Sequence, residues 1–183
     1  MHIGVFSFNT EYMMRTDKLA LAAEERGFES LWVPEHTHIP VPRGDEQADP
    51  DTGMPMSAAD FFLPKEYRHL SDPFTALAAA AAVTKRIRLA TCVCLINQHH
   101  PINLAKHIAT IDHLSDGRFT FGIGAGWNVR EMGNHGVKFS TRWREARERL
   151  AALRVLWREE KASFSGEFVE IDECWQYPKP VQA

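Results

Sequence analysis

Three polar segments carry side chains that could do chemistry, and each follows an apolar run typical of a buried strand. They are Glu35-His36-Thr37-His38, Asn97-Gln98-His99-His100 and Gly124-Ala125-Gly126-Trp127-Asn128. An imidazole beside a carboxylate suits proton transfer near neutral pH. In parallel β/α folds, functional sites lie at the carboxyl ends of the strands. We therefore expect the three segments to contribute to one site.

A His-x-His pair such as His36 and His38 can hold a metal ion, because alternate residues of a strand point the same way. Metal-dependent barrels usually carry that pair on the first strand, whereas here it follows the second, beyond Pro34. We therefore expect no metal ligand in this chain. The simpler interpretation, a polar loop residue, applies to His38, His99 and His100. His36 differs, because an adjacent acid and a strand end place it at the site.

The glycines of Gly122-x-Gly124-x-Gly126 allow two interpretations. A dinucleotide-binding fingerprint would follow the first strand and have an acidic residue about 20 positions later, which is not the arrangement here. Alternatively, small residues let a flat ring or a neighbouring strand approach closely. The second interpretation is favoured.

Alternating strands and helices are predicted around these segments. Apolar and β-branched runs predict strands at 2–8, 29–34, 87–96 and 118–124. Capping residues and helical spacing predict helices at 16–26, 72–84, 101–114 and 140–160, with Thr16 and Asp72 as N-caps. This β/α order predicts an α/β fold with a parallel sheet, and both an open doubly wound sheet and a barrel fit it.

Residues 39–71 interrupt this order with a long segment rich in Pro, Asp, Gly and Met. Loops of this length inside a compact domain are often functional. We expect 39–71 to be a mobile lid or binding loop within a single domain spanning 1–183.

Several motifs occur in an order that resembles one protein family. They are WVPEH at 32–36, RIRLATCV at 86–93, PINLAK at 101–106, LSDGR at 114–118, GIGAGWN at 122–128 and PKPVQ at 178–182. The chain resembles the luciferase-like monooxygenase family, in particular its members that use the deazaflavin coenzyme F-420. The resemblance implies a parallel β/α (TIM-type) barrel, with F-420 or, alternatively, FMN across the carboxyl ends of the strands.

The resemblance also implies roles for individual residues. Glu35 and His36 match an acid–histidine pair that lies beside the deazaflavin ring and handles protons. Cys92 and Val93 match a non-prolyl cis peptide that backs the ring, and Asn97 matches a polar residue near its pyrimidine edge. The remaining positions implied at the cofactor are Gly124, Gly126 and Trp127. Trp127 stands where sugar-phosphate-oxidising relatives carry a catalytic glutamate, so that substrate class is not expected.

Length adds a further expectation. A complete barrel of this type needs about 250 residues, and 183 residues accommodate only the first four β/α units, a half-barrel. Its open sheet edges predict a homo-oligomer. The expected function is hydride transfer between F-420, or a flavin, and a small organic substrate. The alternatives are an FMN-dependent monooxygenase and a non-catalytic half-barrel that only self-associates.

Composition narrows the function classes. The net charge is −3 and the basic residues are dispersed, which argues against nucleic-acid or anionic-membrane partners. The N-terminus begins directly with a predicted strand and lacks the features of a signal peptide, and no apolar run reaches the roughly 20 residues of a membrane span. The three cysteines show no framework spacing, so we expect reduced thiols in a cytoplasmic protein.

Overall fold

The computed structural model describes residues 1–41 and 63–182. Its centre is a parallel sheet with the strand order β1-β2-β3-β5. The strands are β1 (Gly4–Phe6), β2 (Ser30–Val33), β3 (Arg88–Thr91) and β5 (Phe119–Thr120). All neighbouring pairs in this sheet are parallel. The predicted α/β class and the four parallel strands are therefore confirmed, although each strand is shorter than predicted.

Two of the predicted strands are interrupted. The run 87–96 divides into β3 and β4 (Cys94–Leu95), and the run 118–124 divides into β5 and β6 (Ile123–Gly124). β4 and β6 then form a separate parallel pair. At the interruption, the Thr91 hydroxyl donates to Gly122 O (2.8 Å) and accepts from Gly122 N (3.1 Å). The Thr91 side chain thus bridges the interruption, beside the backbone bond from Cys94 N to Gly122 O (2.8 Å).

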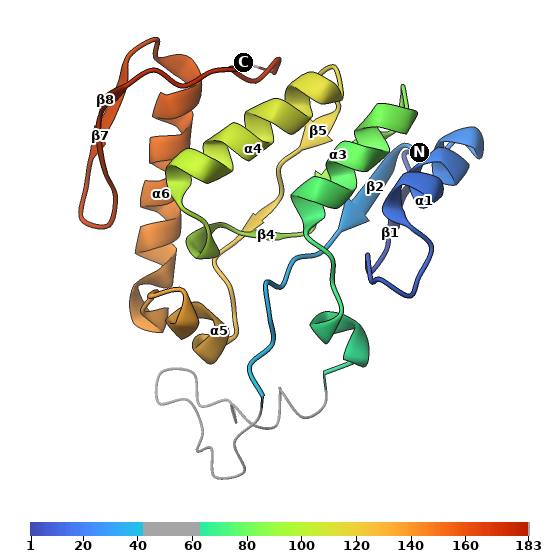
Figure 1. Cartoon of the computed structure of the whole chain (residues 1–183), viewed down its shortest axis with the longest axis horizontal. Helices are drawn as coiled ribbons and strands as arrows, with labels where there is room; N and C mark the ends of the chain where they lie inside the picture. Colours follow the sequence, from blue (N-terminus) through green and yellow to red (C-terminus); the bar gives the residue numbers. More distant parts are fainter. Residues whose placement is uncertain (42–62, 183) are drawn as a thin grey trace.

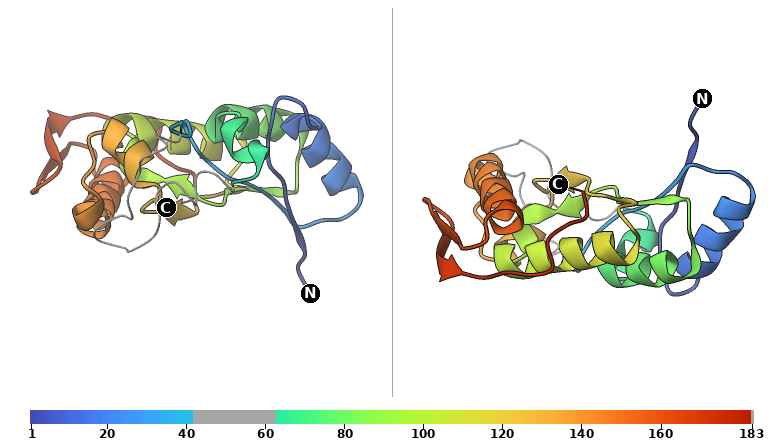
Figure 2. Two further views of the ribbon diagram at one scale, coloured as in Figure 1. Left: turned by 90° about the horizontal axis from the view of Figure 1, so that it is seen from below. Right: turned by 90° about the horizontal axis from the view of Figure 1, so that it is seen from above.

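Helices cover one side of the central sheet. α1 (Thr16–Glu25), α3 (Pro73–Val83) and α4 (Pro101–Leu114) lie together on that side (Figures 1 and 2). The Asp72 carboxylate accepts a hydrogen bond from Thr75 N (2.6 Å), which confirms Asp72 as the N-cap of α3. The N-cap predicted at Thr16 is wrong, because Thr16 is already helical and follows Arg15, which makes no side-chain cap bond.

The core lies between the sheet and these helices. Leu31 and Leu89 from the strands and Leu77 and Leu104 from the helices are all fully buried. The opposite side of the sheet is not covered by these helices (Figure 2). Phe6, whose register partner is Trp32 of β2, is 50% exposed on that side.

The C-terminal part differs most from expectation. A short helix, α5 (Val129–Asn134), precedes α6 (Arg142–Arg158), and only the second was predicted. β7 (Ala162–Ser165) and β8 (Glu170–Cys174) then form an antiparallel hairpin beside α6 (Figure 1). Neither β7 nor the antiparallel pairing follows from the β/α alternation.

The predicted lid at 39–71 falls largely on residues 42–62, which lie outside the described residues. Its last part contains a 3-10 helix, η1 (Lys65–Arg68). The segment after η1 is held to the chain that follows β1, because Asn9 Nδ2 donates to Ser71 O (2.8 Å). Throughout the described ranges, no helix is long and apolar enough to cross a membrane.

Candidate functional site

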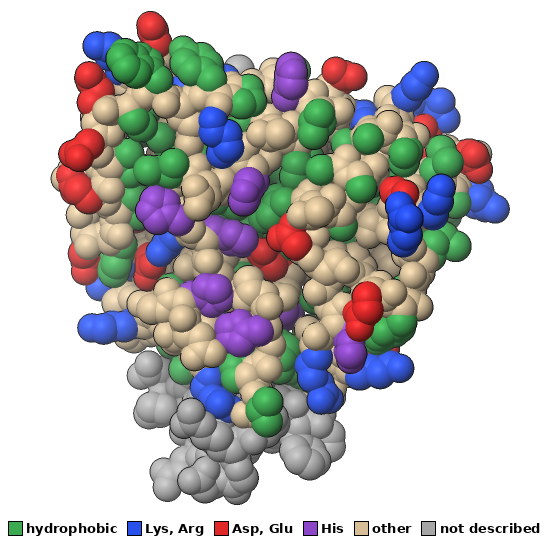
Figure 3. Space-filling model, viewed as in Figure 1, with side chains coloured by type: hydrophobic (Ala, Val, Ile, Leu, Met, Phe, Trp, Pro, Cys, Tyr) green, Lys and Arg blue, Asp and Glu red, His purple; other side chains and the backbone are tan. Residues whose placement is uncertain are grey.

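The carboxyl ends of β2, β4 and β6 bring the three polar segments together, as the sequence predicts. Hydrogen bonds link these segments in series. Thr37 Oγ1 of the first donates to Gln98 Oε1 of the second (3.0 Å), and Asn97 Nδ2 of the second donates to Ala125 O of the third (3.1 Å). His36 of the first segment contacts Glu131 of α5, the helix that follows the third. Histidine side chains gather in the middle of this face of the molecule (Figure 3). The fold therefore concentrates imidazole and carboxylate groups at one edge of the sheet.

A buried pair between His36 and Glu131 is the central contact. His36 Nδ1 lies 2.7 Å from Glu131 Oε2, and the two side chains are 5% and 1% exposed. Glu131 is fixed in the first turn of α5, where its backbone N–H donates to the capping side chain of Asn128 (3.0 Å). Because a carboxylate can only accept here, Nδ1 carries the hydrogen of this bond and Nε2 is the other nitrogen available for proton exchange.

Aromatic rings frame His36. Its ring centroid lies 5.3 Å from that of Tyr67 and 5.6 Å from that of Trp127, the latter at an interplanar angle of 75°. Trp127 itself is 41% exposed. The imidazole is thus held between two rings, one of which reaches the open side of the site. Sequence reasoning placed His36 and Trp127 here, but it gave no role to Glu131, which is 95 positions away from His36.

Glu35 points to different partners from those of His36. Its Oε2 accepts from Leu95 N (2.6 Å), and its Oε1 lies 2.7 Å from Nε2 of His99. The Glu35 and His99 side chains are 2% and 16% exposed. The structure therefore joins Glu35 to His99, a residue interpreted from the sequence as part of a polar loop, and gives Glu35 and His36 separate hydrogen-bond partners.

The segment between β3 and β4 is shaped for close packing. The peptide bond between Cys92 and Val93 is cis, as the family resemblance implied. A Cβ atom added at Gly124 would lie 2.7 Å from Val93 Cγ2, and one at Gly122 would lie 2.2 Å from Thr91 O. Any larger residue at either position would collide with this segment. Gly122 and Gly124 therefore serve close approach, in agreement with the favoured interpretation.

Gly126 and Asn97 are two more of the residues that the family resemblance implied at the cofactor. Gly126 adopts a φ of 90°, a conformation that favours glycine, and packs near the Met132 side chain. Asn97 is 2% exposed, and its Nδ2 donates to Ala125 O (3.1 Å) and Arg142 O (2.9 Å). Its Oδ1 has no hydrogen-bond partner among the described residues.

A second group of histidines lies beside this pair. Thr37 Oγ1 is 3.0 Å from Nδ1 of His38 and 2.8 Å from Nε2 of His135. Burial lowers the pKa of His135, and the neighbouring His38 lowers it further. His135 also borders a cavity of about 360 Å³ that includes His99, His100 and Arg149 in its wall.

Cys94 of β4 is completely buried. Burial raises the pKa of the Cys94 thiol well above its ordinary value, and the adjacent Glu35 carboxylate adds to the rise. This thiol is therefore protonated near neutral pH in the absence of a bound cation. Cys92, by contrast, is exposed.

Comparison with known proteins gives one family for the whole chain. The sequence model of the family described as "Luciferase-like monooxygenase" matches residues 1–183. An uncharacterized protein of Mycobacterium tuberculosis is 48% identical over 183 residues, which are 100% of this chain and 62% of the relative. The chain thus spans about six tenths of the length of this curated relative.

Solved structures of related oxidoreductases share the fold of this chain. The monooxygenase RslO1 from Streptomyces bottropensis is similar with a TM-score of 0.78 and 27% identity, covering 100% of this chain and 50% of that chain. An F420-dependent secondary alcohol dehydrogenase, solved with an F420-acetone adduct, is similar with a TM-score of 0.72 and 25% identity, covering 98% and 49% of the two chains. One of these proteins is a monooxygenase and the other a dehydrogenase.

Proposed function

Because this chain belongs to the luciferase-like monooxygenase family, we propose that it is an oxidoreductase that transfers hydride between the deazaflavin F-420, or a flavin, and a small organic substrate. The observation that carries the proposal is the buried His36–Glu131 pair between two aromatic rings, at the carboxyl ends of parallel strands. Such a pair supplies the proton transfer that accompanies hydride transfer to or from an organic molecule.

The residues at this edge fit a flat, partly polar ring. Binding sites for such ligands combine apolar walls with a few oriented polar groups. Val93, Ile123 and Trp127 are 37%, 37% and 41% exposed, so they offer apolar surface without rearrangement. The buried Oδ1 of Asn97, which lacks a partner among the described residues, would supply the polar contact once ligand binding uncovers it. These groups support the cofactor role proposed for Cys92, Val93, Asn97, Gly124, Gly126 and Trp127.

When bound, the coenzyme supplies the carbon or nitrogen centre that exchanges hydride. The chain's own contribution is to orient the reactants and to move a proton. With Nδ1 held by Glu131, His36 uses Nε2 to donate a proton to, or accept one from, the substrate oxygen. Glu131 stabilises the imidazolium form and fixes the ring orientation, and the rings of Tyr67 and Trp127 limit access of water.

We also propose that the four β/α units are half of an eight-unit barrel. The chain matches about half of each solved relative. In that barrel, the sheet side that carries Phe6 and Trp32, opposite the helices, would be the inner wall, which is consistent with the exposure of Phe6. In a complete barrel this side is filled by side chains from the other strands.

A binding titration tests the proposal. The 183-residue protein is titrated separately with F-420 and with FMN, and binding is followed by the coenzyme's fluorescence and absorbance. Saturable binding of F-420 supports the deazaflavin enzyme. Preference for FMN together with substrate-dependent oxygen consumption supports the alternative, an FMN-dependent monooxygenase. Binding of neither coenzyme contradicts the proposal and, with self-association in solution, favours the non-catalytic half-barrel.

The role of His36 predicts a separable effect of substitution. His36→Asn should retain coenzyme affinity within about threefold while turnover falls by about 10²–10⁴-fold, the usual contribution of a general acid or base. Turnover is measured as a change in coenzyme absorbance with a panel of small alcohols and carbonyl compounds. His113→Asn, at the exposed end of α4, is the matched control. Unchanged turnover in His36→Asn across pH 5–8 would remove His36 from the reaction.

A further inference from the structure

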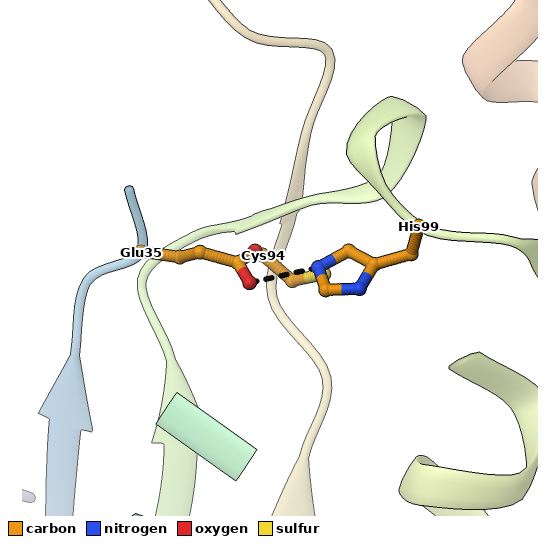
Figure 4. Close-up of side chains that lie close together, drawn as sticks. All are labelled: Glu35, Cys94 and His99. Carbon is orange, nitrogen blue, oxygen red and sulfur yellow. Dashed lines mark hydrogen bonds and ion pairs between the residues drawn. The ribbon is translucent and has the colours of Figure 1, made fainter. Parts of the chain in front are cut away.

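A second group of side chains lies beside the site just described, and the proposed function does not use it. Glu35, two residues beyond the end of β2, Cys94 of β4 and His99, directly after η2 (Ile96–Gln98), converge from three segments (Figure 4). One ligand atom from each, a carboxylate oxygen, a sulfur and an imidazole nitrogen, lies within 4.8 Å of the other two. We propose that Glu35, Cys94 and His99 bind a divalent transition-metal cation, with zinc as the best match.

The ligand types select the cation. Sulfur, imidazole nitrogen and carboxylate oxygen are the three donors that proteins use for zinc. Magnesium and calcium prefer sites made of oxygen alone, so a thiol and an imidazole disfavour them. A thiolate, a carboxylate and a neutral imidazole carry two negative charges, which balance a divalent cation. The loaded site would be electrically neutral, as a buried position requires.

The distances are close to those of a zinc site. Zinc lies about 2.3 Å from sulfur and about 2.0–2.2 Å from nitrogen and oxygen, so tetrahedral ligand atoms are roughly 3.3–3.7 Å apart. Glu35 Oε1 and His99 Nε2 are 2.7 Å apart, and the largest separation in the group is at most 4.8 Å. Side-chain movements of about 1 Å would therefore place all three atoms around one cation.

Neighbouring groups already orient the Glu35 carboxylate and hold the backbone of His99. The second carboxylate oxygen of Glu35 accepts from Leu95 N (2.6 Å). The backbone oxygen of His99 accepts from Arg149, which is itself paired with Glu145 of α6 (2.7 Å). Such outer contacts fix the direction of metal ligands and raise affinity.

The cavity of about 360 Å³ gives the site a route to solvent. His99 forms part of its wall, together with His100 and Arg149. Three protein ligands leave one tetrahedral position open, and a water molecule from this cavity would fill it. Glu35 and Cys94 are 3% and 0% exposed, so His99 is the ligand nearest to solvent.

Zinc binding displaces hydrogens from two of the ligands, and each must have a destination. In the metal-free protein, His99 Nε2 carries the hydrogen shared with Glu35, since the carboxylate can only accept. Zinc replaces that hydrogen and also the thiol hydrogen of Cys94. The thiol proton goes to solvent, and the imidazole either moves its hydrogen to Nδ1 or, if doubly protonated, releases one as well. Affinity should therefore fall as the pH is lowered.

The competing interpretation is a metal-free hydrogen-bond network that only shapes the strand ends. A nucleophilic cysteine is not a competitor, because Cys94 has no exposed surface and no substrate can reach its sulfur. The two remaining interpretations differ in one observable, which is stoichiometric binding of a metal ion through sulfur.

The test uses the protein without a polyhistidine tag, stripped of metal by a chelator. Cobalt(II) is added first, and the near-ultraviolet absorption of a thiolate–cobalt bond is recorded; zinc is then added in competition. We expect one cobalt per chain, a thiolate band, and its loss when one equivalent of zinc is added. Because wild-type protein is used, this measurement does not depend on whether a variant folds. Absence of the thiolate band or of one-to-one binding overturns the proposal.

Variants locate the site. Cys94→Ser and His99→Gln should each weaken zinc binding by more than about 100-fold, the upper range seen even for groups that only support metal ligands. Cys174→Ser and His113→Gln are the matched controls, because they remove one thiol and one imidazole elsewhere, and they should retain wild-type affinity. Equal zinc affinity in Cys94→Ser and Cys174→Ser would overturn the assignment.

Discussion

Single carboxylates at buried positions hold distant segments of this chain together. Glu24, near the end of α1, accepts hydrogen bonds from the backbone N–H groups of Lys85 (3.0 Å), Arg86 (2.5 Å) and Ile87 (2.9 Å). Burial alone would raise the pKa of Glu24, but these three hydrogen bonds outweigh it, and the pKa lies below its ordinary value of 4.5. The charged carboxylate thus anchors the chain that enters β3.

Glu24→Gln should therefore lower the free energy of unfolding by about 1–3 kcal/mol at pH 7, because a neutral amide oxygen is a weaker acceptor and its NH₂ faces backbone donors. The difference from wild type should shrink as the pH falls. A lowered folded-state pKa stabilises above the ordinary value, and this contribution disappears as pH drops through the folded pKa. Urea denaturation between pH 7 and pH 3 measures both effects.

Glu25→Gln is the matched control, since Glu25 is the exposed neighbour. A loss of stability in Glu25→Gln equal to that in Glu24→Gln would show that the backbone hydrogen bonds are not responsible.

Hydrogen bonds between residues far apart in the sequence could not be predicted from the sequence alone. Glu35, His36 and Asn97 could be placed at the strand ends because local patterns locate the end of an apolar run. The partnership of His36 with Glu131 joins positions 95 apart, and no spacing rule relates them. His99 was assigned to a polar loop, since nothing near it in the sequence indicates its contact with Glu35.

At the scale of elements, helical spacing and the prolines at helix starts were good guides, whereas strand continuity and the N-cap predicted at Thr16 were not. The helices α3 and α4 begin at the prolines that predicted them. The run 87–96 is apolar almost throughout, so its interruption after Thr91 leaves no signal in the pattern. The hairpin of β7 and β8 depends on Glu148 of α6, whose carboxylate accepts from the backbone N–H groups of 167–169. That contact is again non-local.

Gly122→Ala tests the close approach at the interruption. The added Cβ would lie 2.2 Å from Thr91 O, a backbone atom that cannot move without disturbing β3. We expect a loss of stability of at least about 1–3 kcal/mol, the usual cost of overpacking, measured as the denaturation midpoint at constant m. Gly133→Ala in α5 is the control, because no atom beyond its chain neighbours and the backbone of its own helix lies within 4 Å of its Cβ position. Equal stabilities of the two variants would contradict the predicted collision.

At the scale of the whole molecule, the alternation of strands and helices correctly predicted the parallel sheet. The helices α1, α3 and α4 cover one side of that sheet (Figure 2). The other side exposes the apolar side chain of Phe6 (50%) near the N-terminus. β1 is also an edge of the central sheet. Apolar surface beside an unpaired strand edge favours pairing with another chain.

We therefore predict that the 183-residue protein self-associates through this side. Light scattering should give a mass above that of a monomer at micromolar concentration, and Phe6→Asp should shift the equilibrium toward the monomer. Val83→Asp, on α3, introduces the same charge at a residue of similar exposure (45%) and should leave the mass unchanged. A wild-type monomer at high concentration would refute the prediction.

The opposite orientations of Glu35 and His36 have a consequence for how this chain can evolve. Each side chain has its own partner, the half-buried His99 for Glu35 and the buried Glu131 for His36. A deletion of one residue between β2 and Glu35 would exchange the two directions and present each group to the wrong partner, since side-chain direction along an extended chain alternates. Descendants that keep both pairs should therefore change here by substitution and not by insertion or deletion, even while neighbouring loops vary in length.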